Sequence, residues 1–270
     1  MEICYSILDP TGNITALVES PVEPAERQKA AAAIMLRHPE VEQVGFLCLA
    51  GADGLPSLSM AGGEFCGNAS MCAAALITMC SAEDGEISLH VSGAAEPVAL
   101  CLRSEGQNAY LAEIVMPPAL GISETVFAFG GLSGTLPLVR MEGISHLVIE
   151  PDSAFFALLD NRPAAETTVR EFCEALGADG LGLLFLEGSG TERRMTPLVY
   201  IPGSGTCFWE NSCASGSAAV GMYLSGKTDS AAELSLSEPG GTLRVRSDPE
   251  SGETRLYGRV RFVGEYELKI

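Results

Sequence analysis

Basic residues are scarce in this sequence, and no long hydrophobic run interrupts it. Its 16 Lys and Arg are outnumbered by 35 Asp and Glu, so the formal net charge is −19. Nucleic acids and anionic membrane surfaces are bound through clusters of Lys and Arg, so we expect neither as a partner. No apolar stretch approaches the ~20 residues that cross a bilayer, and the N-terminus has no basic segment followed by an apolar one. We therefore predict a cytoplasmic protein with no membrane span.

Metal-binding and disulfide patterns are also missing. The nine cysteines are an odd number without framework spacing, there is no CxxC pair, and His38, His90 and His146 stand far apart. Structural zinc sites need closely spaced Cys and His, and disulfide scaffolds need an oxidising compartment. The sequence predicts free thiols and no metal site.

What the chain does contain is enough apolar sequence for a large folded core. Of its 270 residues, 47% are hydrophobic and 19% are charged. This composition is typical of a globular protein, and the length suits one large domain or two ordinary ones.

A cysteine motif occurs twice in the chain. Cys66 and Cys213 are each followed by small residues and then by a run rich in Ala and Met. The two cysteines lie 147 positions apart, and the same separation relates the alternating segments 86–89 and 233–236. A single short match would be chance, but elements that recur in order at one separation indicate a duplication.

Secondary-structure patterns repeat around the two motifs. Residues 24–37 and 164–176 have helical patterns, and each is followed by an apolar strand with a glycine, at 44–47 and 181–184. Further alternating segments, separated by Gly-containing turns, follow each cysteine motif. Few helices against many short strands indicate an α+β protein made of two pseudo-symmetric halves.

Each motif cysteine is predicted to stand at the start of a helix. Asn and Ser favour helix N-termini, and the Ala-rich runs that follow favour the helix interior. The unpaired N–H groups and the dipole of a helix N-terminus can lower a thiol pKa from about 8.5 into the range ~3.5–7.5. The same N–H groups suit a substrate carboxylate. Matching positions in two copies favour catalysis by Cys66 and Cys213 over a structural role.

Two such thiols on opposite sides of one cavity could invert a carbon centre. One thiolate would remove a proton while the opposing thiol delivers a proton to the other face, which is general acid–base catalysis without a metal or a pyridoxal ring. The remaining cysteines within apolar stretches are expected to be buried and structural: Cys4, Cys48, Cys72, Cys80, Cys101 and Cys173.

At these residues the sequence resembles the diaminopimelate epimerase and proline racemase superfamily. Residues 64–72 are similar to the first-cysteine motif, and residues 212–217 are similar to the second, with Ala214 where the family usually has Gly. The resemblance covers essentially the whole chain. It implies two halves, each a mainly antiparallel strand barrel wrapped around a central helix, with the C-terminal strand returning to the first half.

The domain boundary is predicted at the paired prolines of residues 116–118, because proline interrupts the hydrogen bonding of a sheet. The first half then covers residues 1–118 together with the returning strand 263–270, and the second half covers residues 119–262.

The resemblance also assigns candidate substrate contacts. Asn13 lies in a segment similar to the N-terminal loop whose Asn contacts substrate, Glu42 and Gln43 stand in the place of an Asp-Gln pair, and His146 ends a segment like the loop that carries a His beside the active site. The full predicted substrate-binding set is Asn13, Glu42, Gln43, Gly67, Asn68, His146, Glu210, Ala214, Ser215 and Gly216.

Departures from the superfamily pattern bear on the substrate. Diaminopimelate epimerases carry a Glu-Arg pair shortly before the second cysteine, and residues 203–211 contain no Arg. An Asn expected ahead of the first motif is replaced near residues 59–60. The second carboxylate of diaminopimelate would therefore lack its ionic partner.

The chain resembles more closely the histidine racemases of opine-metallophore (staphylopine-type) biosynthesis. The similarity lies in the WENSC motif of residues 209–213, in residues 63–68 and in the PGG of residues 239–241. It implies a free L-amino acid with a neutral or cationic side chain as the substrate, histidine first, and no cofactor. Glu42 and Glu210 are candidates for contacting an imidazole or imidazolium; the alternative is that either is a solvated or structurally paired acid.

Other interpretations stay open at this point. The chain could be a diaminopimelate epimerase or a racemase of broad specificity, and a homodimer is a possible assembly. A different class would be a non-catalytic or redox protein in which Cys66 and Cys213 form a reversible disulfide. An isomerase like PhzF would share the fold but would not need a cysteine in both places.

Overall fold

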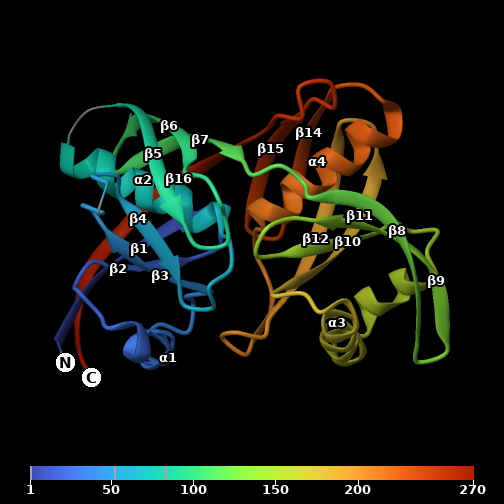
Figure 1. Cartoon of the computed structure of the whole chain (residues 1–270), viewed down its shortest axis with the longest axis horizontal. Coiled ribbons are helices and arrows are strands. Elements are labelled where there is room, and N and C mark those ends of the chain that lie inside the picture. The colour runs from blue at the N-terminus through green and yellow to red at the C-terminus, as the bar shows by residue number, and fades with distance from the viewer. Residues whose placement is uncertain (1, 52, 82–83) are drawn as a thin grey trace.

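The computed structural model describes residues 2–51, 53–81 and 84–270, which form two strand-rich halves lying side by side (Figure 1). Within this part of the chain no helix is both long and apolar enough to cross a membrane. The strands and helices of the first half are β1 (Glu2–Pro10), β2 (Thr15–Val18), the 3-10 helix η1 (Pro24–Glu26), α1 (Arg27–Arg37), β3 (Gln43–Cys48), β4 (Ser57–Met60), α2 (Gly67–Ser81), β5 (Gly85–Val91), β6 (Val98–Gly106) and β7 (Ala109–Met116). Those that follow are β8 (Gly121–Phe129), β9 (Leu132–Arg140), β10 (Ser145–Ile149), η2 (Ala154–Asp160), α3 (Arg162–Leu176), β11 (Leu181–Ser189), β12 (Glu192–Ile201), β13 (Thr206–Trp209), α4 (Ala214–Thr228), β14 (Ala232–Glu238), β15 (Gly241–Ser247) and β16 (Thr254–Lys269).

The last strand, β16, joins the two halves. Its first part pairs with β15 and β7, and its C-terminal part pairs antiparallel with β1. The β1–β16 pairing closes the strands β1 to β7 and β16 into a ring, with α2 packed against most of these strands. From β16 the sheet continues into the second half, where it surrounds α4 in the order β15, β14, β12, β11, β10, β9 and β8. The predicted α+β class, with two strand-built halves around central helices and a returning C-terminal strand, is confirmed; the residue numbers of the division remain a prediction.

The duplication is visible in the element boundaries. Helices α2 and α4 both have 15 residues, and their bounds differ by the 147 positions that separate the two cysteines. Strands β5 and β14 are related by the same shift. The parallel strand pairs also recur in order, with β2–β3 and β4–β5 in the first half and β10–β11 and β12–β14 in the second.

The two central helices are buried on nearly every side, and most of their side chains are small. Buried residues run without a break from Gly67 to Leu76 in α2 and from Ala214 to Met222 in α4. A helix that is surrounded by strands cannot present a polar face to solvent, and Ala, Gly and Ser also allow the close approach of neighbouring elements. Helices α1 and α3 instead cover the sheet from outside, as Figure 1 shows.

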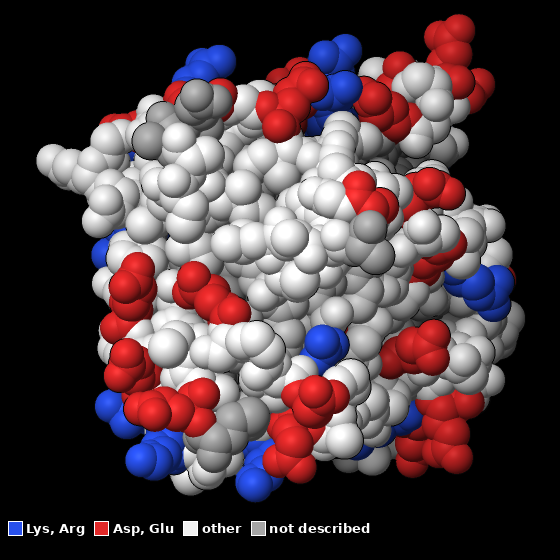
Figure 2. All heavy atoms as spheres, turned by 60° about the vertical axis from the view of Figure 1, so that its left-hand side comes forward, with Lys and Arg blue, Asp and Glu red and all other residues white. Residues whose placement is uncertain are grey.

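The surface carries the acidic excess of the sequence. On the face in Figure 2, Asp and Glu lie mainly around the rim, and Lys and Arg occur among them without forming a continuous basic patch. Several of the basic residues are paired with carboxylates, as in the Arg255–Glu113 and Arg259–Glu105 ion pairs.

The expectation that the cysteines in apolar stretches are all buried is wrong for four of them. Cys72 and Cys173 are buried, but Cys4, Cys48, Cys80 and Cys101 are exposed. Cys4 and Cys101 occupy outward positions of strands whose neighbouring residues point inward. The two-residue period of a strand therefore outweighs the apolar character of the segment.

Two matching glycine turns support the loops that carry the site cysteines. Gly93 follows β5 and Gly240 follows β14, and they are also 147 positions apart. A Cβ on Gly93 would lie 2.3 Å from the backbone nitrogen of Phe65, and a Cβ on Gly240 would lie 3.0 Å from Cβ of Asn211. Each turn thus packs against the residues just ahead of a cysteine.

We expect Gly93→Ala to lower the unfolding free energy by at least ~2 kcal/mol. Gly93 has φ of +72°, which costs an L-residue about 1–2 kcal/mol, and the contact with Phe65 adds to that cost. Gly106→Ala is the matched control, since Gly106 has φ of +79° and nothing within 4 Å of the added Cβ. Thermal denaturation should show a drop of at least ~5 °C for Gly93→Ala and a smaller drop for Gly106→Ala. Equal drops would show that the turn does not support the loop.

Candidate active site

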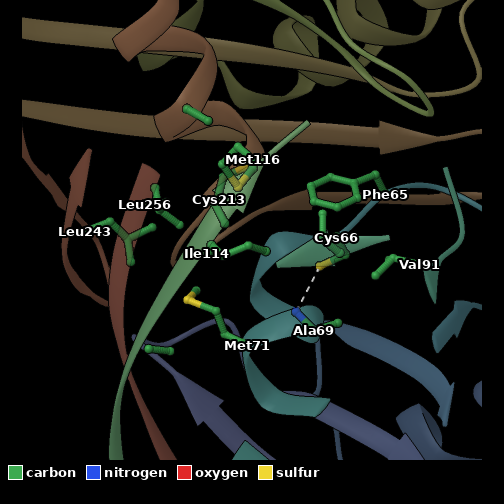
Figure 3. Close-up of a cluster of buried hydrophobic side chains, with 14 of the residues drawn as sticks. Phe65, Cys66, Ala69, Met71, Val91, Ile114, Met116, Cys213, Leu243 and Leu256 are labelled. Atoms are coloured by element: carbon green, nitrogen blue, oxygen red, sulfur yellow. Dashed lines mark hydrogen bonds between the residues drawn. The ribbon is translucent and has the colours of Figure 1, made fainter. Parts of the chain in front are cut away.

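The two cysteines meet where the starts of the two central helices face each other. Cys66 directly precedes α2, and Cys213 is the N-cap of α4. A Cβ added to Gly67 would lie only 2.9 Å from Cβ of Ala214, so the first residues of the two helices are in contact. Figure 3 shows both cysteines in one buried cluster with Phe65 and Met116. The prediction that both cysteines stand at helix starts is confirmed.

Both cysteines line one small cavity of about 20 Å³. Its other lining residues come from both halves of the chain: Asn13, Gln43, Glu64, Phe65, Gly67, Asn68, Ile144, Val199, Ile201, Glu210, Ala214 and Ser215. Glu64 and Glu210 are the charged groups of this lining, which contains no Lys, Arg or His among the described residues. This acidic lining favours a cationic or N–H-donating occupant.

Three oxygen atoms around the cavity accept no hydrogen bond from the described protein groups. They are Oδ1 of Asn13, Oε2 of Glu64 and Oδ1 of Asn68. The amide nitrogen of Asn13 donates to Glu42 at 2.7 Å, and that of Asn68 donates to the carbonyl oxygen of Ser212 at 2.9 Å. Since both amide nitrogens face acceptors, both amide oxygens are left as free acceptors. A ligand with several N–H donors would satisfy all three.

The carboxylates beside the cavity belong to a network that crosses the two halves. The side-chain amide of Gln43 donates to Glu210 at 2.9 Å. Glu42 lies behind Asn13 and accepts from its side chain and from the backbone and side chain of Asn211. Burial raises the pKa of Glu42 and raises that of Glu210 to about 8. Glu42 therefore orients Asn13, and Gln43 orients Glu210.

A second, larger cavity of about 190 Å³ adjoins the first. The two share Gln43 and Glu64, and Glu42 lines the larger one together with residues of α1 and of the turn before β13. The side chain of Gln28 on α1 donates to the carbonyl oxygen of Gly203 at 2.6 Å, so this cavity also lies between the two halves.

His146 lies behind the second cysteine and not in the cavity wall. Its Nε2 is 3.0 Å from Oγ of Ser215, and that hydroxyl is 3.7 Å from Sγ of Cys213. The ring packs on Gly182, where a Cβ would lie 2.3 Å from Nδ1. Complete burial lowers the pKa of His146 to about 3, so the ring is neutral. His146 can reach the thiol only through Ser215.

The expectation that the helix N-termini lower the thiol pKa values is wrong. Burial raises the pKa of Cys66, and the carboxylates of Glu210 and Glu64 raise it further, against a lowering by the backbone N–H of Ala69. Burial likewise raises the pKa of Cys213, with further increases from Glu210 and Glu238. Desolvation and neighbouring negative charge outweigh the helix dipole at both sulfurs.

The remaining predicted residues fall into two groups. Gly67, Asn68, Ala214 and Ser215 line the cavity as the first residues of the two helices. Gly216 lies behind the cavity, where a Cβ would be 3.2 Å from Sγ of Cys213, so its small size makes room for the thiol. Among the described residues no group of three or more His, Cys, Asp or Glu is arranged to hold a metal ion.

Two acidic residues of the site were not singled out from the sequence. Glu64 lies two residues before Cys66, within the repeated motif, so its place beside the cavity could have been inferred. Glu238 ends β14, and its carboxylate accepts from the backbone N–H of Cys213 at 2.6 Å and from Oγ of Ser217 at 2.7 Å. No local pattern links Glu238 to Cys213, because 25 residues separate them. The apolar lining residues Phe65, Ile144, Val199 and Ile201 were likewise not predicted.

Comparisons with solved structures agree with this architecture. A predicted epimerase from Pseudomonas aeruginosa superposes with a TM-score of 0.70 at 18% identity, covering 99% of both chains. A probable proline racemase from Agrobacterium radiobacter gives 0.68 at 12% identity, covering 99% of this chain and 93% of that one. A PhzF family protein from Bacillus anthracis gives 0.66 at 11% identity over the whole of both chains. At these identities the likeness concerns the fold alone.

Sequence comparison gives the family. A histidine racemase from Fusobacterium nucleatum is 29% identical over 273 residues, which is 97% of this chain and 95% of the relative. A histidine racemase from Staphylococcus aureus is 29% identical over 250 residues, covering 90% of this chain and 88% of the relative. The model of the histidine racemase CntK N-terminal domain matches residues 2–266. This match spans nearly the whole sequence, and the chain therefore belongs to the histidine racemase CntK N-terminal domain family.

Proposed function

We propose that this protein is a cofactor-independent histidine racemase in which Cys66 and Cys213 exchange the Cα proton of the substrate. The observation that carries the proposal is that one thiol from each half of the duplicated chain lines a single cavity. In one direction the thiolate of one cysteine takes the Cα proton and the thiol of the other delivers its proton to the opposite face. In the reverse direction the two cysteines exchange these roles.

The carboxylate of the amino acid would bind between the two helix N-termini. The first N–H groups of a helix have no partner within the helix, and Gly67, Asn68, Ala214 and Ser215 bring those of α2 and α4 to the cavity wall. When the Cα proton leaves, negative charge moves onto this carboxylate. Preorganised N–H donors on both sides would stabilise that charge in the transition state.

The amino group of the substrate would lie near the acidic side of the cavity. Glu64, Glu210 and the free amide oxygens of Asn13 and Asn68 are all acceptors, which suits an ammonium group with three N–H donors. An ammonium between Glu64 and Glu210 would also offset the negative charge that raises the thiol pKa values. Substrate binding would thereby help one of the two thiols to ionise.

The adjoining cavity offers space for the substrate side chain. An amino acid with its Cα between the sulfurs could extend past Gln43 and Glu64 into the volume of about 190 Å³. Glu42 and Glu64 line that volume, so a side chain with an N–H donor, such as imidazole, would find acceptors there. The second carboxylate of diaminopimelate would meet these acidic groups without an Arg or Lys among the lining residues.

The test is incorporation of solvent deuterium. We expect the reduced protein, incubated with L-histidine in deuterated water, to give a racemic mixture with deuterium at Cα of the D-product, measured by chiral chromatography and mass spectrometry. Diaminopimelate, glutamate and lysine serve as comparison substrates. Their kcat/KM values should be at least ~100-fold lower than that of histidine. Exchange with diaminopimelate at the rate found with histidine would contradict the proposed substrate. Absence of Cα exchange with every amino acid would contradict racemase chemistry.

A further inference from the structure

The two halves differ at one position that bears directly on the second thiol. Strands β5 and β14 end at Val91 and Glu238, which correspond under the shift of 147 positions. Val91 is apolar and buried, whereas Glu238 places a carboxylate at the start of α4. The duplication therefore supplies its own comparison: a buried carboxylate lies beside one cysteine loop, and the apolar side chain of a valine lies at the equivalent place beside the other.

Glu238 occupies the part of the helix N-terminus that would otherwise favour a thiolate at Cys213. One carboxylate oxygen accepts the N–H of Cys213 at 2.6 Å, and the other accepts the hydroxyl of Ser217 at 2.7 Å. The side chain is 7% exposed and does not line the cavity, so a substrate cation cannot reach it. When Glu238 is ionised, its negative charge opposes a second negative charge on the adjacent sulfur.

The surroundings of Cys66 oppose a thiolate less than those of Cys213 do. Its Sγ accepts the backbone N–H of Ala69 at 3.4 Å, which stabilises a thiolate (Figure 3). Glu64 is the nearby carboxylate on this side, but it lines the cavity with a free oxygen and can be neutralised by a substrate ammonium. Glu210 lies near both sulfurs, and its charge raises the pKa of both thiols. It also accepts a hydrogen bond from the thiol of Cys213.

We propose that Glu238 is a positioning residue that divides the roles of the two thiols, holding Cys213 as the proton donor and leaving Cys66 as the thiol that ionises more readily. This inference rests on the proposed function, in which one thiol must be ionised and the other protonated. The enzyme would thus exist mainly in one of its two proton arrangements and would bind one enantiomer in the arrangement ready for reaction. Ser217, Glu210 and the Ser215–His146 pair are the other polar groups that face the start of α4 and Cys213.

The experiment measures the rate at which iodoacetamide alkylates each cysteine in the substrate-free protein, followed by peptide mass spectrometry. Alkylation depends on the thiolate fraction and on access to each sulfur, whether or not histidine is the substrate, so the change caused by Glu238→Gln is the decisive comparison. In the wild type we expect Cys66 to react at least ~10-fold faster than Cys213 above pH 8, where Glu238 is ionised. Glu238→Gln should raise the rate at Cys213 and bring the ratio toward one, with the rate at Cys66 changed less than about twofold.

Glu233→Gln is the matched control, since Glu233 lies exposed on the same strand and its loss should leave the ratio unchanged. If Glu238→Gln does not fold, the pH dependence of the wild type tests the proposal instead. Ionisation of Glu238 near pH 8 should increase the ratio of the alkylation rate at Cys66 to that at Cys213 as the pH rises. A faster reaction at Cys213 in the wild type, or a ratio that neither the substitution nor the pH changes, would overturn the assignment. Failure of histidine racemisation with the ratio as expected would instead count against the proposed function alone.

Discussion

Replacing either Cys66 or Cys213 by Ser is expected to reduce racemisation of histidine by at least ~10³-fold. A positioned general acid or base contributes about 10²–10⁴-fold, and a Ser hydroxyl is far less acidic than a thiol, so it can serve neither as the base nor as an effective proton donor. Both sulfurs line the cavity from opposite halves, and each is required in both reaction directions. The double variant should be no worse than either single variant, because one missing partner already interrupts the proton exchange.

The measurement is kcat/KM in both directions, with thermal denaturation to establish that each variant is folded. Cys72→Ala and Cys101→Ser are the controls, since one removes a buried thiol outside the cavity and the other an exposed one. Both should keep activity within about threefold of the wild type. Racemisation by the double variant near the wild-type rate would contradict the two-thiol mechanism. A cycle of oxidation and reduction between the thiols, without Cα exchange, would favour the redox alternative.

The placement of both cysteines could be predicted because helix starts are encoded locally. Small residues and then Ala-rich runs follow Cys66 and Cys213, and these patterns fix where α2 and α4 begin. The shift of 147 positions adds a second line of argument, since it relates entire elements and not single residues. The helix and strand assignments around the motifs were confirmed for the same reason.

The ionisation of these thiols could not be predicted from the same local pattern. The helix dipole is a property of the adjacent residues, whereas burial and the carboxylates of Glu64, Glu210 and Glu238 depend on how the halves pack. Glu238 reaches Cys213 only because β14 returns beside the start of α4. Once the duplication was recognised, comparison of Glu238 with Val91 was the signal that could have identified it.

The wrong prediction that the exposed cysteines are buried has a different origin. Cys4 lies between Ile3 and Tyr5, which are 0% and 1% exposed, so alternation along β1 turns Cys4 outward. The average hydropathy of a segment says that it forms part of a core, but not which of its residues face that core. The two-residue period contains this information.

We expect the protein to lose stability as the pH rises from about 6.5 to about 8. Burial raises the pKa of Glu210 and of Glu238 to about 8 in the folded protein, against the usual 4.5 of a glutamate. Between those values the folded state holds protons that the unfolded state has released, so the free energy of unfolding falls with increasing pH. Below the lower value both states are protonated and the full contribution is present, while above about 8 it has been lost.

His146 reduces the effect of the two acids below pH 6.5 without reversing it, because one group acts against two down to about pH 4.5. Burial lowers the pKa of its ring to about 3 from its usual 6.5, so acidification below about 6.5 protonates the unfolded state first and reduces the contribution of this group to stability. Above 6.5 only the acids act. Each of the two acids lowers the free energy of unfolding by up to about 1.36 kcal/mol per pH unit. Over about 1.5 pH units the total is at most ~4 kcal/mol, which corresponds to a fall in Tm on the order of 10 °C.

The measurement is Tm at constant ionic strength for the wild type, for each single variant Glu210→Gln and Glu238→Gln, and for the double variant. Each neutral Gln should remove part of the fall between pH 6.5 and pH 8, and the double variant should remove most of it. Glu233→Gln should not, because Glu233 is exposed on the surface of β14. A fall that persists undiminished in the double variant would assign the pH dependence to the overall charge of −19 and not to the two buried acids beside Cys213.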